Sequence, residues 1–379
     1  MNKQRLLSLD IYRGITIVFM IIVNTPGSWQ YVYAPLRHSE WHGCTPTDLV
    51  FPSFLFIVGV SMWFSMKKYG HNLNTASVLK ILYRTLIIFA AGFLLVWFPF
   101  FGKELSTVRI MGVLQRIALA YGFGALICLI VKRNYLWVVS AVILLGYWAL
   151  LYFAGGNEPY SLEGNVVLKF DLLLLGENHL YHGFGIPFDP EGLLSTIPAV
   201  ATVIIGFMAG EIVGSGPADM KKVLRMVLIG LLLTIAGLVW NIWFPINKPL
   251  WTSSYVLYTG GLSLIILGLL YLLIDVLNFK WWTGFFKVFG MNALFIYIMA
   301  SLWTKIMLLI KIGAAGEKMS LYSWIYTMLC VPIMESIYNL LNINKYMFEN
   351  ASLLFALLQV FLMWILVYIL YRRKIFIKV

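Results

Sequence analysis

Ionisable side chains gather in the segment that links the first two long apolar runs of the chain. It reads Arg37-His38-Ser39-Glu40-Trp41-His42-Gly43-Cys44-Thr45-Pro46-Thr47-Asp48. A neutral histidine, whose ordinary pKa is about 6.5, can take a proton from a nucleophile near neutral pH, and a carboxylate can orient it. His38 and His42 are therefore candidate bases, with Asp48 as the orienting group. A structural interpretation competes, and composition alone favours it: both histidines are solvated, and Thr45 and Asp48 form a capping box.

Two pairs of histidines have spacings that would place their side chains on one face of a helix, which is one arrangement of metal ligands. The pairs are His38 with His42 and His179 with His182. Helix-breaking residues surround the first pair, and no feature of the sequence brings the two pairs together, so we predict no metal site. The three cysteines form no C-x-x-C pair, so neither a disulfide framework nor a thiol metal site is expected.

Polar side chains inside the apolar runs are a second source of candidates. Arg109 and Arg116 are seven residues apart, two helical turns on one face, with Gln115 beside the second. An arginine within the membrane normally faces a partner or a watery cavity. For Arg84 and Arg109, snorkelling from a helix end is the favoured interpretation, whereas Arg116 is the better candidate for a cavity.

Asn24 ends the first apolar run and lies close in sequence to the histidine segment. It could donate a hydrogen bond to a developing oxyanion, or serve as a plain helix cap. At the start of the same run, the spacing of Asp10 and Arg13 predicts an ion pair within one helix. Three later polar segments are also candidates: 188–192, where Asp189-Pro190 is equally typical of a helix start, 247–255 and 290–293.

The composition of the chain predicts the kind of secondary structure that positions these residues. The chain has 379 residues, of which 61% are hydrophobic and 12% charged. A soluble domain carries about 25% charged residues, so an ordinary soluble enzyme is excluded. Apolar stretches of about 18 residues or more recur along the chain, each long enough to cross the membrane. They are continuous rather than alternating, which excludes a β-barrel and predicts an all-α, polytopic membrane protein.

We expect membrane spans at roughly 9–25, 47–66, 78–100, 109–131, 135–154, 192–212, 222–245, 252–276, 285–310 and 352–371. A further segment, 322–341, contains Pro332 and Glu335, which weaken it as a span. We therefore predict ten crossings, with an interfacial or re-entrant helix in the region of about 313–350. Eleven crossings are the alternative.

Basic clusters fall in alternate connections between these spans, which places the N-terminus in the cytoplasm. With ten crossings the basic tail at 372–374 is cytoplasmic too. The two sizeable outside loops are then 26–46 and the acidic 155–191, and residues 1–379 form a single membrane domain with a retained first helix. The net charge of +12 suits an anionic lipid surface, and no nucleic-acid partner is expected.

Taken in order, several motifs resemble the heparan-α-glucosaminide N-acetyltransferase family and its bacterial relatives. The opening Leu-Asp-x-x-Arg-Gly is similar to that of a wider group of membrane acyltransferases, and the longer motifs are more specific. The motifs are Leu9-Asp10-Ile11-Tyr12-Arg13-Gly14 through Asn24, His38 to Pro52 with Trp41-His42-Gly43, Arg109 to Arg116, Phe188 to Pro198, Phe244 to Tyr255 and Gly290-Met291-Asn292.

We expect a multi-pass protein of the cytoplasmic (inner) membrane, embedded in membrane lipid, and the resemblance implies a homodimer. It implies transfer of an acetyl group from cytoplasmic acetyl-CoA to the amine of a terminal glucosamine, or related amino sugar, on the far side. The family's active-site histidine corresponds to His38. Relatives can have Asn before the glycine of Trp41-His42-Gly43, so His42 can share the role.

The site residues expected on this basis form three groups. The catalytic group is His38, Asp48, Asn24 and His42. The acetyl-CoA group is Arg116, Gln115, Arg84 and Asn292. The acceptor group is Trp41, Asp189, Glu191, Lys248, Trp251 and Ser254.

Two routes for the acetyl group remain open. His38 acts as a base in direct transfer, or as a nucleophile that forms a transient acetyl-imidazole. We favour direct transfer because one positioned base is enough for it. Two other functions also fit the sequence. A transporter or flippase for amino sugars or glycans would explain the arginines within the membrane, and an O-acyltransferase would acylate sugar hydroxyls instead of amines.

Overall fold

The computed structural model describes residues 6–313, 318–342 and 345–377, and it confirms the all-α expectation. The only strands in this part of the chain are β1 (Lys311–Ile312) and β2 (Met319–Ser320), which form a small hairpin. The helices are α1 (Leu7–Asn24), α2 (Val50–Met66), α3 (Thr75–Trp97), α4 (Val113–Ile130), α5 (Leu136–Ala154), α6 (Val166–Leu175), α7 (Thr196–Gly214), α8 (Met220–Trp240), α9 (Ser253–Tyr271), α10 (Thr283–Met291), α11 (Ala293–Leu309), α12 (Leu321–Ile325), α13 (Val331–Leu341) and α14 (Met347–Arg372).

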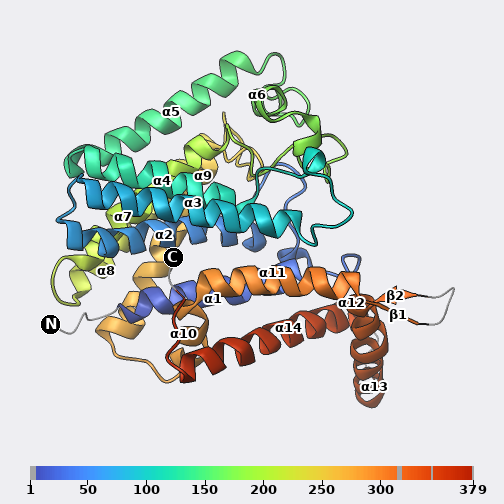
Figure 1. The fold of residues 1–379 in the computed structure, drawn as a ribbon. Helices are drawn as coiled ribbons and strands as arrows, with labels where there is room; N and C mark the ends of the chain where they lie inside the picture. Colours follow the sequence, from blue (N-terminus) through green and yellow to red (C-terminus); the bar gives the residue numbers. More distant parts are fainter. Residues whose placement is uncertain (1–5, 314–317, 343–344, 378–379) are drawn as a thin grey trace.

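The long helices lie side by side in one bundle, with their axes close to a common direction (Figure 1). We name the two ends of this bundle by residues near them. The Leu7 end holds the start of α1, and the His38 end holds the end of α1 and the segment from Arg37 to Asp48. The short helix α6 lies at the His38 end, between α5 and α7 in the chain (Figure 1).

The segment Leu321–Leu341 is long and apolar enough to span a membrane, but its contacts place both ends at the His38 end. The hydroxyl of Tyr322 donates to the carbonyl oxygen of Pro26 at 2.5 Å, and Tyr338 contacts Asn350 at the beginning of α14. Figure 1 accordingly shows α12 and α13 set across the ends of α11 and α14. The segment therefore leaves and re-enters the bundle on one side, as expected for an interfacial helix.

The remaining spans then number ten within the described residues. Nine are single helices, and the tenth is formed by α10 and α11, which meet at an angle of 84° at Asn292. Ten crossings, with Leu321–Leu341 as an interfacial segment, stay the prediction. Parts of the 313–350 region, at 314–317 and 343–344, lie outside the described residues.

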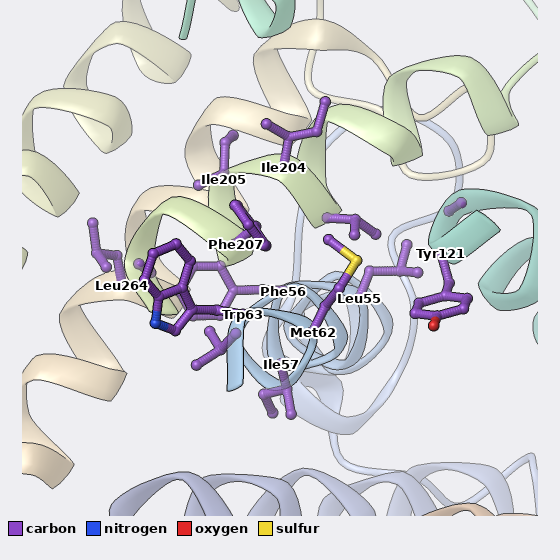
Figure 2. Close-up of a cluster of buried hydrophobic side chains, with 14 of the residues drawn as sticks. Leu55, Phe56, Ile57, Met62, Trp63, Tyr121, Ile204, Ile205, Phe207 and Leu264 are labelled. Carbon is purple, nitrogen blue, oxygen red and sulfur yellow. The ribbon is translucent and has the colours of Figure 1, made fainter. Parts of the chain in front are cut away.

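The centre of the bundle is the contact between α2 and α7. Figure 2 shows Phe56, Trp63 and Phe207 packed together there. Two glycines permit the close approach: a Cβ on Gly59 would lie 2.0 Å from the carbonyl oxygen of Val203, and one on Gly206 would meet α2 in the same way. Small residues commonly let membrane helices pack backbone against backbone.

Two predicted helix starts are wrong. α4 begins at Val113, so Arg109 lies in the segment before the helix and does not share a helical face with Arg116. α7 begins at Thr196, so Asp189-Pro190 does not start it. In both places the residue concerned belongs to the ion-pair cluster described below.

Two local predictions are confirmed: Arg13 pairs with Asp10 at 3.0 Å, and Thr45 and Asp48 form the capping box.

The basic clusters of the connections share one end of the bundle. Every one that falls in the described residues lies within or next to a helix segment at the Leu7 end. These clusters are Lys67 and Lys68, Lys132 and Arg133, Lys221, Lys222 and Arg225, Lys280 and Lys287, and Arg372 to Lys374.

Candidate active site

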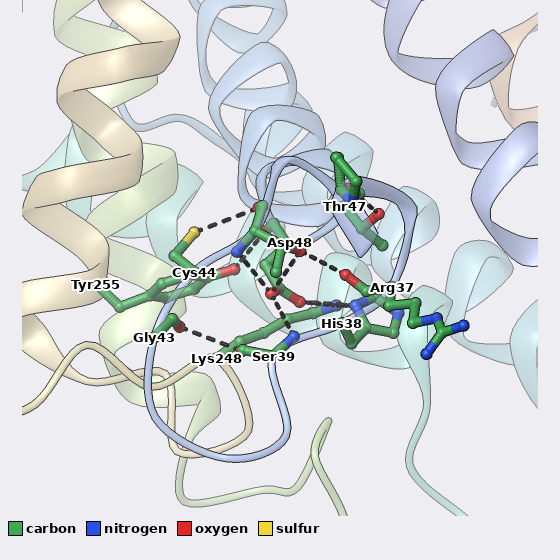
Figure 3. A network of polar contacts seen from close by, with 11 residues as sticks. Arg37, His38, Ser39, Gly43, Cys44, Thr47, Asp48, Lys248 and Tyr255 are labelled. Carbon is green, nitrogen blue, oxygen red and sulfur yellow. Dashed lines mark hydrogen bonds and ion pairs between the residues drawn. The ribbon is translucent and has the colours of Figure 1, made fainter. Parts of the chain in front are cut away.

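The two oxygens of the buried Asp48 carboxylate make different contacts. It belongs to the 3₁₀ turn Pro46–Leu49, which leads directly into α2. Its Oδ2 accepts hydrogen bonds from the backbone N–H groups of Ser39 and Thr45, both at 3.0 Å, and from the Thr45 hydroxyl at 3.1 Å. Its Oδ1 lies 2.6 Å from Nδ1 of His38 (Figure 3). The capping box therefore uses Oδ2, while Oδ1 makes the contact with His38 that the orienting interpretation requires.

The contact with Asp48 determines which nitrogen of His38 is available. A carboxylate accepts hydrogen bonds, so the tautomer that suits this contact has its hydrogen on Nδ1 of His38 and its lone pair on Nε2. The His38 side chain is 47% exposed, whereas that of Asp48 is 1% exposed. His38 is thus held from behind by a buried anion while its other nitrogen can meet a substrate.

Lys248 joins this pair from a distant part of the chain. Its Nζ lies 3.3 Å from Oδ1 of Asp48 and 3.1 Å from Nδ1 of His38. The connection between α8 and α9 carries it and is tied to the histidine segment by Asn247, whose amide donates to the carbonyl oxygen of Trp41 at 2.9 Å. The carboxylate of Asp48 therefore contacts both a histidine and a lysine, which are 210 residues apart in the sequence.

A cavity of about 130 Å³ lies beside His38 and runs into the bundle between α1, α2, α4 and α11. A water molecule takes up about 30 Å³ in the liquid, so the cavity admits a small polar group and the arm that carries it. Most of its wall is apolar, with polar groups near His38. The lining residues are Met20, Val23, Asn24, His38, Thr47, Val50, Phe51, Phe54, Val113, Ile117, Glu191, Lys248 and Tyr297.

Arg109, Asp189 and Glu191 form an ion-pair cluster at the edge of this cavity. Arg109 binds Asp189 through two hydrogen bonds of 2.8 and 2.6 Å, and its Nη2 also lies 2.5 Å from Oε2 of Glu191. Burial alone would raise the pKa of Glu191, but the charges of Arg109 and Arg116 outweigh it and lower that pKa. Glu191 is therefore ionised at neutral pH. The snorkelling interpretation of Arg109 is wrong, because its guanidinium has these carboxylates as partners.

Arg116 is fully buried behind the cavity wall and does not line it. Its guanidinium donates to the carbonyl oxygen of Gly192 at 3.1 Å and to the hydroxyl of Ser195, and it lies 5.0 Å from the ring centre of Trp251. Asp171 of α6 approaches the same turn, accepting from the backbone N–H of Leu193 at 3.1 Å. Burial raises the pKa of Asp171 to about 7, with the nearby Asp189 adding to the effect.

The other residues expected to bind acetyl-CoA are also away from the cavity lining. The Gln115 side chain donates to the carbonyl oxygen of Ile110 at 3.0 Å, and Arg84 stacks on Tyr121. Asn292 lies at the Leu7 end, where its amide bonds the main chain of Ile375 and Ile377 after α14.

Several residues expected to bind the acceptor, together with His42, support the loops around His38. Trp41 donates to the carbonyl oxygen of Tyr160 at 2.8 Å and so joins the two loops of the His38 end. Nδ1 of His42 lies 3.3 Å from the amide of Asn247, and burial lowers the pKa of His42. Trp251 and Ser254 are completely buried beneath the site.

The structure thus brings Asn24, His38, Glu191 and Lys248 to one cavity, with Asp48 behind His38. Sequence analysis missed Tyr297, which lines the inner part of the cavity from α11. A tyrosine hydroxyl within an otherwise apolar predicted span, 285–310, was the feature of the sequence that could have indicated it. It also missed the direct contact between Arg109 and Glu191, because the two residues are 82 positions apart.

Comparison with known proteins adds an independent finding. A family model described as heparan-alpha-glucosaminide N-acetyltransferase, catalytic, matches residues 5–216. The heparan-alpha-glucosaminide N-acetyltransferase of Mus musculus is 30% identical over 358 residues, covering 78% of this chain and 53% of the relative. That of Homo sapiens is 31% identical over 353 residues, covering 78% and 52%. The chain spans about half the length of the curated relatives it matches.

Proposed function

Because the chain belongs to the heparan-alpha-glucosaminide N-acetyltransferase family, we propose that it transfers an acetyl group from acetyl-CoA to the amine of a terminal glucosamine or a related amino sugar. The observation that carries the proposal is His38, held by the buried carboxylate of Asp48 and facing a cavity in the membrane bundle. This is the arrangement of a general base and its orienting group.

The reaction needs such a base because an ammonium group has no lone pair with which to attack a thioester. Nε2 of His38 accepts a proton from the acceptor amine as the nitrogen attacks the acetyl carbon. A C–N bond forms and the C–S bond breaks, and the departing thiolate of CoA takes the proton from the His38 imidazolium. Asp48 stabilises that imidazolium, and Asn24 in the same lining donates a hydrogen bond to the developing oxyanion.

We favour direct transfer over an acetyl-enzyme route. Cys44, the thiol of this segment, has its pKa raised to about 12 by burial, with the charge of Asp48 adding to the rise. It is therefore protonated at neutral pH and unsuited to carry the acetyl group. One base and one cavity are enough for attack within a ternary complex, which predicts sequential rather than ping-pong kinetics.

Orientation in the membrane follows from the basic clusters at the Leu7 end. By the positive-inside rule that end faces the cytoplasm, together with both termini, and the His38 end faces the opposite side. Acetyl-CoA then enters from the Leu7 end, and the amino sugar meets His38 from outside. The cavity between α1, α2, α4 and α11 is where the acetyl arm reaches the acceptor.

The test is CoA release from acetyl-CoA by the full chain in nanodiscs, with and without glucosamine. We expect glucosamine-dependent release that is lost in His38→Ala and kept in His182→Ala, a histidine of the exposed outer loop. Absence of release with glucosamine or glucosamine-ended oligosaccharides, from folded wild-type protein, would contradict the proposal. Uptake of amino sugars into liposomes, with no need for acetyl-CoA, would then favour a transporter.

A further inference from the structure

Glu191 is the carboxylate that lines the cavity beside His38, and the transfer step described above does not use it. We propose that Glu191 binds the acceptor as a cation and so makes the site selective for amino sugars over neutral sugars. The inference rests on the proposed function and identifies the residue that sets its specificity.

The direct contacts around Glu191 leave a negative charge at the cavity. Arg109 is already matched by Asp189, which it binds through two hydrogen bonds and whose side chain is 0% exposed. Glu191 is a second carboxylate on the same guanidinium, through Oε2 alone. The three groups therefore carry one negative charge in excess, and Glu191, 13% exposed, is the member that reaches the cavity.

The neighbouring cations do not cancel this charge by contact. Arg116 attracts Glu191 through space, but the hydrogen bonds that it makes, from Nη2, go to Gly192 and Ser195 and not to Glu191. Lys248, on the same cavity, also acts on Glu191 through space and lies 3.3 Å from Asp48, the carboxylate that matches it. Arg109 binds Glu191 through Oε2 alone, so the other carboxylate oxygen can accept a hydrogen bond from an ammonium group.

The carboxylate is also held in place before a ligand arrives. The backbone N–H of Glu191 donates to Oδ1 of Asp189 at 2.9 Å, and Arg109 lies 4.8 Å from the ring centre of Tyr181. A fixed anion against an apolar wall is poorly solvated, and a cation that binds it relieves this cost. A sugar hydroxyl brings no charge, so it gains much less from the same contact.

The position of Glu191 also fits the order of events at His38. An amino sugar enters as an ammonium ion and Glu191 holds it. His38, 47% exposed, removes one proton and passes it to solvent, and it then accepts the second proton of the amine during the attack, which leaves with the CoA thiolate. Binding and deprotonation are thus performed by separate groups. Loss of Glu191 is expected to weaken binding of the cationic acceptor and to leave proton removal intact.

The experiment compares two amine acceptors in the full chain in nanodiscs. Glucosamine is assayed at a pH below the pKa of its own amine, and hydroxylamine, a weakly basic amine that is largely uncharged there, serves as the neutral acceptor. In Glu191→Gln we expect KM for glucosamine to rise about tenfold or more, as for loss of a charged hydrogen bond. KM for hydroxylamine should stay within about twofold. Glu163→Gln, in the outer loop, is the matched control.

A binding measurement without acetyl-CoA completes the test. Thermal-shift titration of the wild type should show stabilisation by glucosamine but not by glucose, and Glu191→Gln should lose that preference. Equal KM values for glucosamine in wild type and Glu191→Gln, or equal losses with both acceptors, would overturn the role of Glu191. Wild-type protein that acetylates neither acceptor would overturn the proposed function instead, while the binding titration still decides whether Glu191 selects a cation. If Glu191→Gln does not fold, Glu191→Asp should keep the preference with a weaker affinity.

Discussion

Nδ1 of His38 lies 2.6 Å from Oδ1 of Asp48, while the second oxygen of the same carboxylate closes the turn that begins the α2 span. The candidate base is therefore fixed to the start of a membrane helix. A change at Asp48 must affect both the chemistry of His38 and the local fold, and the two effects can be separated by comparing neighbouring substitutions.

Asp48→Asn should lower kcat by about 100-fold or more with a smaller effect on KM. The amide presents an N–H to Nδ1 of His38, so the imidazole hydrogen moves to Nε2 and the base is lost. Thr45→Val removes hydrogen bonds of the turn but leaves the His38–Asp48 contact, so it should cost about 1 kcal/mol of stability and little activity. Steady-state kinetics and thermal unfolding of both variants measure this. Wild-type kcat in Asp48→Asn would exclude the orienting role.

Arg109→Met should be strongly destabilising, by about 3–5 kcal/mol, because it leaves Asp189 and Glu191 buried without their guanidinium. Arg133→Ala is the matched control, since its pair with Glu211 is exposed and 3.4 Å long, and it should cost at most about 1 kcal/mol. Thermal unfolding in detergent compares the two. Similar midpoints for both variants would show that the Arg109 cluster contributes little to the fold.

Asp171 should make the protein less stable as pH rises. Its pKa is raised to about 7 in the folded state from an ordinary 3.8, so between these values the unfolded chain loses this proton while the folded chain keeps it. Ionisation then favours unfolding, and stability falls from about pH 4 to about pH 7 and levels off above it. Asp171→Asn removes this contribution. Its unfolding midpoint relative to wild type should be higher at pH 8 than at pH 4, and an equal difference at both pH values would contradict the assignment.

Gly59→Ala tests the contact between α2 and α7. The added Cβ would lie 2.0 Å from the carbonyl oxygen of Val203, so the helices must separate, at a cost of about 1–3 kcal/mol or more. Gly146→Ala in α5 meets nothing within 4 Å and should be neutral or stabilise the helix by about 0.5–1 kcal/mol. Thermal unfolding of the two variants is the measurement. A neutral effect of Gly59→Ala would argue against close packing at this point.

The sequence by itself determined the features that depend on neighbouring residues. Each span is visible because about 30 Å of hydrocarbon demands a continuous apolar run, and Pro332 and Glu335 marked the segment whose two ends lie at the same end of the bundle. The pairing of His38 with Asp48 could be anticipated for the same reason. The two residues share one short loop, and the capping box that fixes Asp48 is a local motif.

Only the tertiary structure decided how distant segments meet at the cavity. Lys248 reaches His38 across 210 residues, and Arg109 reaches Glu191 across 82. Hydropathy cannot predict such contacts. All the spans have a similar apolar composition, because all must lie in hydrocarbon, so composition does not indicate which helices are neighbours. The partners are chosen by close packing and by the need of each buried charge for an opposite charge. This is why Arg109, which resembles a snorkelling arginine in the sequence, positions the carboxylate of Glu191 in the folded protein.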